Sequence, residues 1–174
     1  MYELLKYTDE VDKSLGIAGM AIALLACDGE NFVASVSVDQ SGPGLEFAPE
    51  AFFAHNPRFS AKIAWNQLMR EFHVFSGMLL GNVMCRHLVT NKNVQREIVD
   101  ILHELISAHG GSECSLENDE LDEIFNKDMV YFRRLFSHPA VADVARDFAG
   151  ALRAQRSMTA GEVFEHLSRL NSGF

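Results

Sequence analysis

The pattern of hydrophobic and polar positions changes abruptly near the middle of the chain. From Val74 to Cys85 nearly every side chain is apolar, and only Ser76 and Asn82 carry hydrogen-bonding groups. A helix that is apolar on all sides is typical of a segment surrounded by its own protein, and this run is shorter than the ~20 residues that span a membrane. We therefore predict a long central helix over about residues 60–89, with residues 74–85 enclosed on all sides.

Helical spacing of apolar residues continues to the C-terminus and predicts four further helices. The first ends at the double glycine 110–111. Ser115 and the acids after it open the second, and Pro139 begins the third. Thr159 and Glu162 form a capping-box pattern that opens the last. The positions expected to face the core are Leu121, Phe125, Phe132, Phe136, Val141, Ala145, Phe148, Leu152, Val163, Phe164, Leu167 and Leu170.

Residues 9–27 fit two structures. Their apolar positions recur at alternating spacings of four and three, which is typical of a helix, and small residues such as Gly16 and Gly19 would let a neighbour approach closely. The alternative is a hairpin in which Ala21–Cys27 is one strand and Asp28-Gly29 the turn. The run contains few β-branched residues, which favours the helix, but the sequence leaves both structures open.

A clearer strand follows at Phe32–Val38. Its apolar residues share one face, while Ser35 and Ser37 lie on the other. A lone strand cannot satisfy its backbone hydrogen-bonding groups, so it needs a partner. The partners we consider are Tyr2–Tyr7, Ala21–Cys27, or the same strand of a second subunit.

Together these elements predict a mainly α fold, a compact helical bundle around the long central helix (about 60–89), with a small β element near residues 32–38. We expect one helical domain over residues 1–174, in which residues 1–45 form a small α/β or hairpin subregion. A chain of 174 residues, 48% of them hydrophobic, is long enough to bury a core without disulfides or metal.

Charge is unevenly distributed along the chain. The net charge of −9 argues against nucleic-acid binding, which needs clustered basic residues. Residues 1–52 carry nine acids against two lysines, and residues 94–132 carry ten acids against two basic residues, whereas 53–93 and 133–174 are net positive. Such blocks can face each other within one chain or across a two-fold dimer, or they can reflect chance variation of solvated helix faces.

Three cysteines, Cys27, Cys85 and Cys114, leave at least one thiol unpaired, and none forms a C-x-x-C pair. This favours a reducing compartment and structural thiols. Acids interrupt the N-terminal residues, so they do not read as a signal peptide. We expect a cytoplasmic protein that does not bind a membrane.

Pairs of histidine and acid with helical spacing occur at Asp100/His103 and Glu162/His166. Both pairs lie on or beside polar helix faces, so we expect solvated surface pairs, no metal site and no cofactor. Ser76 lies outside the G-x-S-x-G pattern of a nucleophile elbow. We therefore assign no catalytic residue, and enzymatic activity is not favoured.

The best candidate for a binding site lies on the central helix. One stripe carries Glu71, Phe75, Met78, Asn82 and Arg86. A buried arginine is costly unless it is paired. Arg86 therefore needs either a carboxylate from another helix or an anionic ligand. For a structural ion pair we expect the acid to come from residues 94–132, which follow the helix and are rich in acids.

The sequence does not determine a function. The absence of catalytic motifs, the strand that needs a partner and the charge blocks favour a small non-enzymatic protein–protein interaction or regulatory protein. We expect it to form a homodimer and to bind a protein partner. The alternative is a helical domain that binds a small anionic ligand or substrate near Asn82 and Arg86.

Overall fold

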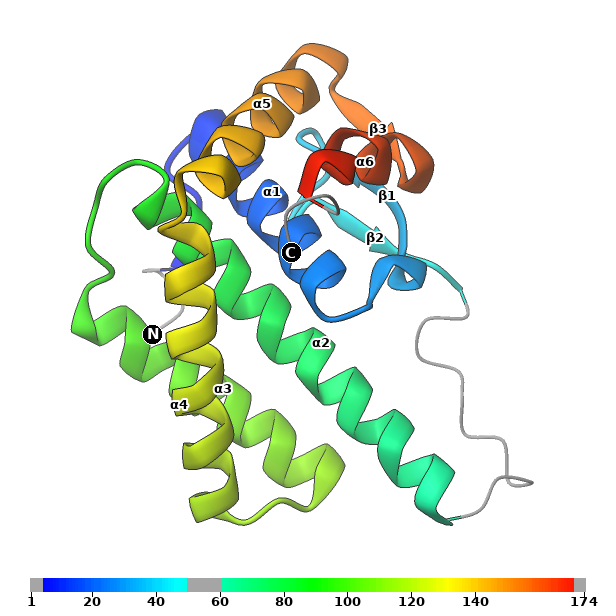
Figure 1. The fold of residues 1–174 in the computed structure, drawn as a ribbon, viewed down its shortest axis with the longest axis vertical. Helices are drawn as coiled ribbons and strands as arrows, with labels where there is room; N and C mark the ends of the chain where they lie inside the picture. Colours follow the sequence, from blue (N-terminus) through cyan, green and yellow to red (C-terminus); the bar gives the residue numbers. More distant parts are fainter. Residues whose placement is uncertain (1–4, 50–60, 171–174) are drawn as a thin grey trace.

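The computed structural model describes residues 5–49 and 61–170, and there the fold is mainly α, as the sequence predicts. Six α-helices and a small three-stranded antiparallel sheet form the described part of the chain (Figure 1). The elements are α1 (Glu10–Ala26), the 3-10 turn η2 (Glu30–Phe32), β1 (Val33–Ser37), β2 (Leu45–Phe47), α2 (Ala61–Leu88), α3 (Arg96–Cys114), α4 (Asn118–Phe136), α5 (Pro139–Gln155), β3 (Ser157–Thr159), α6 (Ala160–Leu167) and the 3-10 turn η3 (Ser168–Leu170).

The ambiguous segment near the N-terminus is the helix α1. Asp9 caps it, because its carboxylate accepts a hydrogen bond of 2.8 Å from the backbone N–H of Asp12. Residues 14–24 are buried without interruption, which makes this the most enclosed stretch of the described chain. The hairpin alternative is therefore wrong, and α1 is a core helix packed between α2 and α5 (Figure 1).

The backbones of α1 and α2 touch where the two helices cross. A Cβ atom at Gly81 would lie 2.5 Å from the carbonyl oxygen of Gly19 and 2.6 Å from the Cβ of Ala23, and one at Gly19 would overlap the carbonyl of Gly81. Only glycine permits this approach, because any side chain would force the backbones apart. The close approach that the sequence predicts at Gly19 is thus made by Gly81 of α2.

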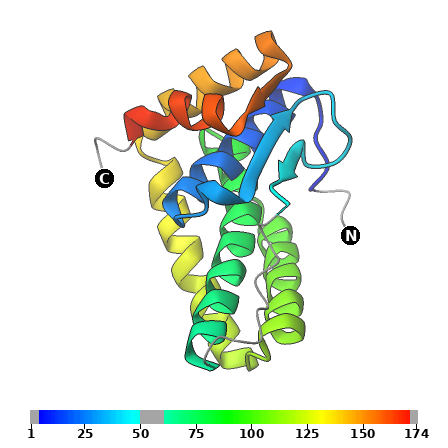
Figure 2. The same ribbon diagram turned by 90° about the vertical axis from the view of Figure 1, so that its right-hand side faces the viewer.

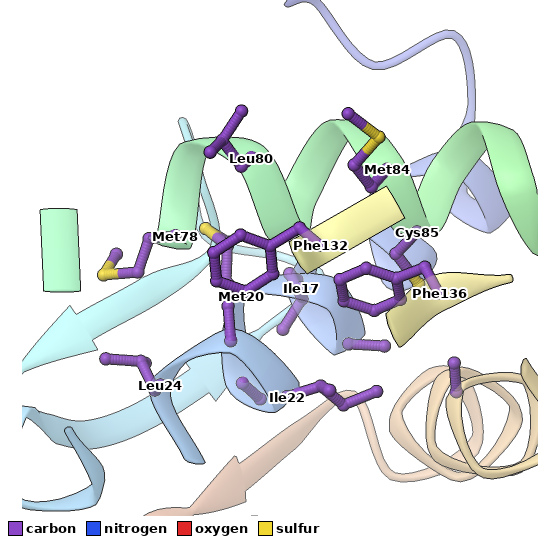
Figure 3. Packing of buried hydrophobic residues seen from close by; sticks show 14 of the residues in the cluster. Ile17, Met20, Ile22, Leu24, Met78, Leu80, Met84, Cys85, Phe132 and Phe136 are labelled. Carbon is purple, nitrogen blue, oxygen red and sulfur yellow. The ribbon is translucent and has the colours of Figure 1, made fainter. Parts of the chain in front are cut away.

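Buried side chains from the six helices and from the three strands form one hydrophobic cluster. Figure 3 shows a part of it in which side chains of α1, α2 and α4 gather between the ribbons. The largest fully buried side chains are Phe72, Phe132, Phe136, Phe148, Ile17, Ile22, Leu24, Leu80, Met84, Leu102, Ile106 and Leu152. Close packing of this kind makes the relative placement of the helices sensitive to small changes in volume.

The central helix is α2, which contacts α1, α3, α4 and α5. It runs beside α3 and α4 in the lower half of the molecule (Figure 2). Its predicted first residue, Ser60, lies outside the described residues. The prediction that 74–85 is enclosed on all sides is wrong, because Phe75, Leu79 and Asn82 are only half-buried. Within 5–49 and 61–170, no helix is both long and apolar enough to cross a membrane.

The sequence predicts that the helix α3 ends at the double glycine 110–111. This prediction is wrong, because α3 continues to Cys114. A Cβ at Gly110 would lie 2.8 Å from the ring of Phe72 and would overlap the side chain of Leu121. This glycine therefore lets α3 approach α2 and α4 closely, and the packing outweighs its low helix propensity. The helix stops at Ser115, whose φ of 51° is left-handed.

The last three helices follow the sequence pattern closely. A capping box between Glu117 and Glu120 opens α4, slightly later than the predicted start at Ser115. Pro139 begins α5, and Thr159 with Glu162 forms the predicted capping box of α6. The predicted inward positions of these helices are buried, apart from Phe164, which is partly buried against the same core.

The small sheet has the order β2-β1-β3, and both pairings are antiparallel. All three partners predicted for the strand at 32–38 are therefore wrong. Strands of three residues are too short to show an alternating pattern, and β3 ends at Thr159, which also caps α6. Both edges of β1 are paired within the chain, so this strand gives no reason for a second subunit.

Oppositely charged blocks of the sequence meet within the chain. Arg156 contacts the carboxylates of Glu10, at 2.8 Å, and of Asp39. Arg86 on α2 pairs with Asp12 on α1. These contacts agree with one of the explanations considered for the charge blocks, namely that blocks of opposite charge face each other within one chain. The homodimer stays a prediction, because nothing in a single chain tests it.

We predict that Gly81→Ala destabilises the fold by about 3 kcal/mol, because the added methyl group forces α1 and α2 apart. Gly150→Ala is the matched control, since nothing lies within 4 Å of its Cβ position in the helix α5. The control should be neutral or stabilising by up to about 1 kcal/mol. Chemical denaturation of both variants measures the difference, and equal stabilities would show that the backbone contact is not tight.

Candidate functional site

A pocket of about 860 Å³ lies between α2, α3, α1 and the segment that joins β1 to β2. Residues 5–7, which precede α1, form another part of its wall. Its described lining is mostly apolar and includes Met20, Leu45, Phe47, Phe75, Met78, Leu79, Val83 and Leu102. The polar side chains of the described lining are Lys6, Tyr7, Lys13 and Asn82.

The pocket explains the open face of the central helix. Phe75, Leu79 and Asn82 follow one another along α2 at steps of four and three, so they share a helix face, and all three line the pocket. Met78, next to this face, is only 9% exposed and also lines it. Three members of the predicted stripe therefore lie on one wall, while Glu71 and Arg86 are outside the described lining.

Hydrogen bonds of Tyr7 connect three segments at one end of the pocket. The amide nitrogen of Asn82 donates to the Tyr7 hydroxyl at 2.7 Å, and that hydroxyl donates to the carbonyl oxygen of Pro43 at 3.3 Å. Burial raises the pKa of the Tyr7 phenol, which keeps it neutral and able to donate. The phenol thus fixes the position of residues 5–7 relative to α2 and to the loop after β1.

Arg86 is buried, with 5% of its side chain exposed, and is paired with Asp12. Its Nε and Nη2 atoms donate to the two oxygens of the Asp12 carboxylate at 2.7 and 2.6 Å. The same guanidinium donates to the carbonyl oxygens of Leu5, at 3.0 Å, and Lys6, at 2.8 Å, and lies 4.9 Å from the ring centre of Tyr7. Its donors are thus directed at protein groups.

The predicted source of the carboxylate, residues 94–132, is wrong. The acid comes from α1, which runs antiparallel to α2. Gly16, in the first half of α1, lies near Asn82, whereas Cys27, just after the end of α1, lies near Gly77. Asp12 precedes Gly16 by one helical turn, and a Cβ at Gly16 would lie 3.2 Å from the Arg86 side chain. The sequence could not show that α1, rather than the next helix, approaches α2 most closely at this position.

The ion pair also shapes the titration of Asp12. Burial alone would raise the pKa of this carboxyl, but hydrogen bonds from Arg86 and from the backbone N–H of Thr8, at 2.9 Å, outweigh burial and hold the pKa below its usual value. The carboxylate therefore stays ionised at neutral pH. Anion binding at Asn82 and Arg86 stays a prediction, and any anion there would have to compete with Asp12.

A second pocket, of about 520 Å³, lies on another side of α2 and contains a polar cluster. Asp128 accepts a hydrogen bond of 3.0 Å from the hydroxyl of Ser76. The same carboxylate lies 3.9 Å from a ring nitrogen of His73 and raises the pKa of that histidine. Burial raises the pKa of Cys27 to about 11, so it remains a thiol. Because Ser76 donates to a carboxylate and not to histidine, the cluster lacks the order of an activated nucleophile.

One of the two histidine and acid pairs from the sequence is retained: the pKa of Glu162 is lowered, chiefly by hydrogen bonds from Thr159 and also by the charge of nearby His166. His103 contacts Asp122, at 2.7 Å, rather than Asp100. The ring of His166 lies edge-on to Phe148. Within the described parts of the chain, no group of three or more histidine, cysteine or acidic side chains could hold a metal ion.

Comparison of the chain with protein families, with characterised proteins and with solved structures found no match. The fold and the pockets therefore supply the observations from which a function can be inferred.

We predict that Asp12→Asn costs about 3 kcal/mol at neutral pH, because it leaves the Arg86 charge buried and unpaired. The folded-state pKa of Asp12 is lowered, so the stability it contributes is present above its unfolded pKa, about 3.9, and is lost as the pH falls through the folded value. The difference between variant and wild type should thus be constant from pH 7 to about 5 and shrink below pH 4.

The control is Asp143→Asn, whose carboxylate forms an exposed pair with Arg146 at 2.9 Å. Exposed pairs of this kind contribute little, so this variant should stay within about 0.5 kcal/mol of wild type at every pH. Urea denaturation at a series of pH values measures both. An Asp12→Asn penalty that persists in acid would mean that the loss does not come from the charge.

Proposed function

We propose that the protein binds a small apolar molecule in the pocket beside α2. The observation that carries this proposal is the pocket itself, whose volume of about 860 Å³ and mainly apolar wall match those of small-molecule sites. Protein interiors are otherwise close-packed, so an apolar space of this size favours an occupant. A ligand would cover the half-buried side chains of Phe75 and Leu79, which otherwise remain partly in contact with water.

The pocket wall combines firm and adaptable elements. On one side α2 is held against α1 by the glycine contact, so its face is fixed. Met20 and Met78 contribute flexible thioether side chains that can adjust to a ligand. Such a combination favours binding of a molecule of defined size with tolerance for its detailed shape.

The side chains in the described lining of this pocket favour ligand binding over catalysis. The titratable side chains in the described lining are Lys6, Tyr7 and Lys13. Burial raises the pKa of Tyr7 further from neutrality, which makes it a poor general base. The proposal agrees with the sequence-based expectation that assigns no catalytic residue, and it develops the ligand-binding alternative.

We expect the neutral fluorophore phenylnaphthylamine to bind the wild-type protein with one-to-one stoichiometry and enhanced emission. Leu79→Trp should weaken this binding at least tenfold, because the larger ring occupies the pocket. Ala154→Trp, at an exposed position of α5 outside the pocket lining, is the control and should bind as wild type does. Fluorescence titration gives the affinities, and circular dichroism checks the fold. Failure of the wild type to bind, or equal binding by Leu79→Trp, would refute the proposal.

We also propose that the protein forms a homodimer through α4, as the sequence-based prediction of a homodimer and of protein interaction suggests. Val130 is 70% exposed and Tyr131 is 47% exposed, and both border a shallow surface that also includes Glu123 and Arg134. Acids lie in the first half of α4 and arginines in its last turn, so two antiparallel copies would match opposite charges across a two-fold axis. A second copy of this chain therefore fits the surface.

If α4 forms this interface, light scattering should report a dimer at high micromolar concentration, and Val130→Asp should convert it to a monomer that keeps the circular-dichroism spectrum of the wild type. Glu97→Gln, an exposed acid on α3, removes a charge elsewhere and should leave the dimer intact. A monomeric wild type would refute the proposal.

We also propose the cytoplasm as the location of the protein. The three cysteines Cys27, Cys85 and Cys114 are free thiols, which is the usual state in a reducing compartment.

A further inference from the structure

The charged side chains in the described lining of the apolar pocket are all of one sign. Lys6 and Lys13 line it, and its described lining contains neither aspartate nor glutamate. The chain as a whole carries a net charge of −9, whereas the described lining of this pocket contains lysines and no acid. Such a local excess of positive charge favours a ligand with an anionic group.

The pocket is polar at one end and apolar at the other. Asn82 and Phe75 are seven residues apart on α2, so the wall between them is about 10 Å long. Tyr7 contacts Asn82, and Lys13 lies one turn before Gly16, which itself abuts Asn82. Phe75 lies at the other end of this wall. A ligand with a polar head and an apolar body would therefore have one preferred orientation.

The charge at the polar end that is available to a ligand comes from Lys13 and not from Arg86. The guanidinium of Arg86 is neutralised by Asp12, which accepts two hydrogen bonds from it. Lys13 donates one hydrogen bond to the backbone carbonyl of Gln40, a neutral acceptor, and its ammonium carries further N–H groups. Lys13 also lowers the pKa of Asp39, but the main partner of that carboxylate is Arg156.

We propose that the ligand is an aliphatic carboxylate of about ten carbons. Its carboxylate lies beside Lys13 and the amide of Asn82, and its hydrocarbon chain runs along α2 toward Phe75. This inference rests on the proposed function, since it names the class of molecule that the pocket binds. It also places the anion predicted from the sequence near Asn82, with lysine rather than Arg86 as the source of attraction.

Calorimetric titration of the full chain with decanoate, decanol and decylamine tests the charge of the head group. Decanoate should bind at least tenfold more tightly than decanol, and decylamine should bind most weakly. Among shorter carboxylates, affinity should fall by about fourfold for each CH₂ removed, because less apolar surface is buried. Equal affinities for decanoate and decanol would overturn the inference and leave the proposed function standing, whereas no binding by any of the three would overturn both.

Two lysine variants locate the head group. Lys13→Met keeps an unbranched side chain but removes the charge, so it should weaken decanoate binding at least fivefold and leave decanol binding within twofold. Lys62→Met removes the same charge at an exposed position near the start of α2, outside the pocket lining, and should change neither affinity. Equal decanoate losses in both variants would show a general charge effect and overturn the placement.

Carbon-13 resonances of carboxyl-labelled decanoate give a readout that needs no variant. Beside Lys13, the carboxyl group of bound decanoate should titrate with a pKa below that of the free molecule, because a nearby cation favours its charged form. In the reverse orientation, burial of the carboxyl among apolar side chains would raise the pKa. A raised pKa for bound decanoate would therefore overturn the proposed orientation.

Discussion

The contact between the backbones of α1 and α2 at Gly19 and Gly81 determines the arrangement of the other elements. Because the two helices run antiparallel at this short separation, Asp12 comes within reach of Arg86, and α1 becomes enclosed between α2 and α5. The same crossing leaves the face of α2 that carries Phe75 and Leu79 turned away from α1. That face, together with residues 5–7 and the loop after β1, makes the pocket.

Local chemistry made much of the helical structure predictable. The capping box at Thr159 and the proline that opens α5 act within a few residues, so their meaning does not depend on the rest of the fold. Gly110 was misread as a helix end because its role depends on Phe72, which lies 38 positions earlier in the sequence. The strand at 32–38 was predicted, but its two partners were missed for a related reason: β2 and β3 span only three residues each, too few for a periodic signal.

Only one wall of the candidate site could be predicted. Phe75, Met78 and Asn82 share a helix face, so their spacing alone is enough to group them. The opposite walls come from residues 5–7 and from the loop between β1 and β2, where no regular spacing marks which side chains point inward. The partner of Arg86 was also misplaced, because sequence distance favoured the following acidic region over α1.

The way in which Arg86 holds the N-terminal segment has a consequence for how the protein can evolve. The guanidinium donates hydrogen bonds to the backbone carbonyl oxygens of residues 5 and 6. Every amino acid has such a carbonyl, so these bonds do not depend on the side chains at the two positions. Substitutions at these two positions can therefore alter the pocket wall while the path of the chain is preserved. Selection could use this freedom to retune which molecules the pocket accepts, at little risk to folding, provided that Arg86 and Asp12 are kept.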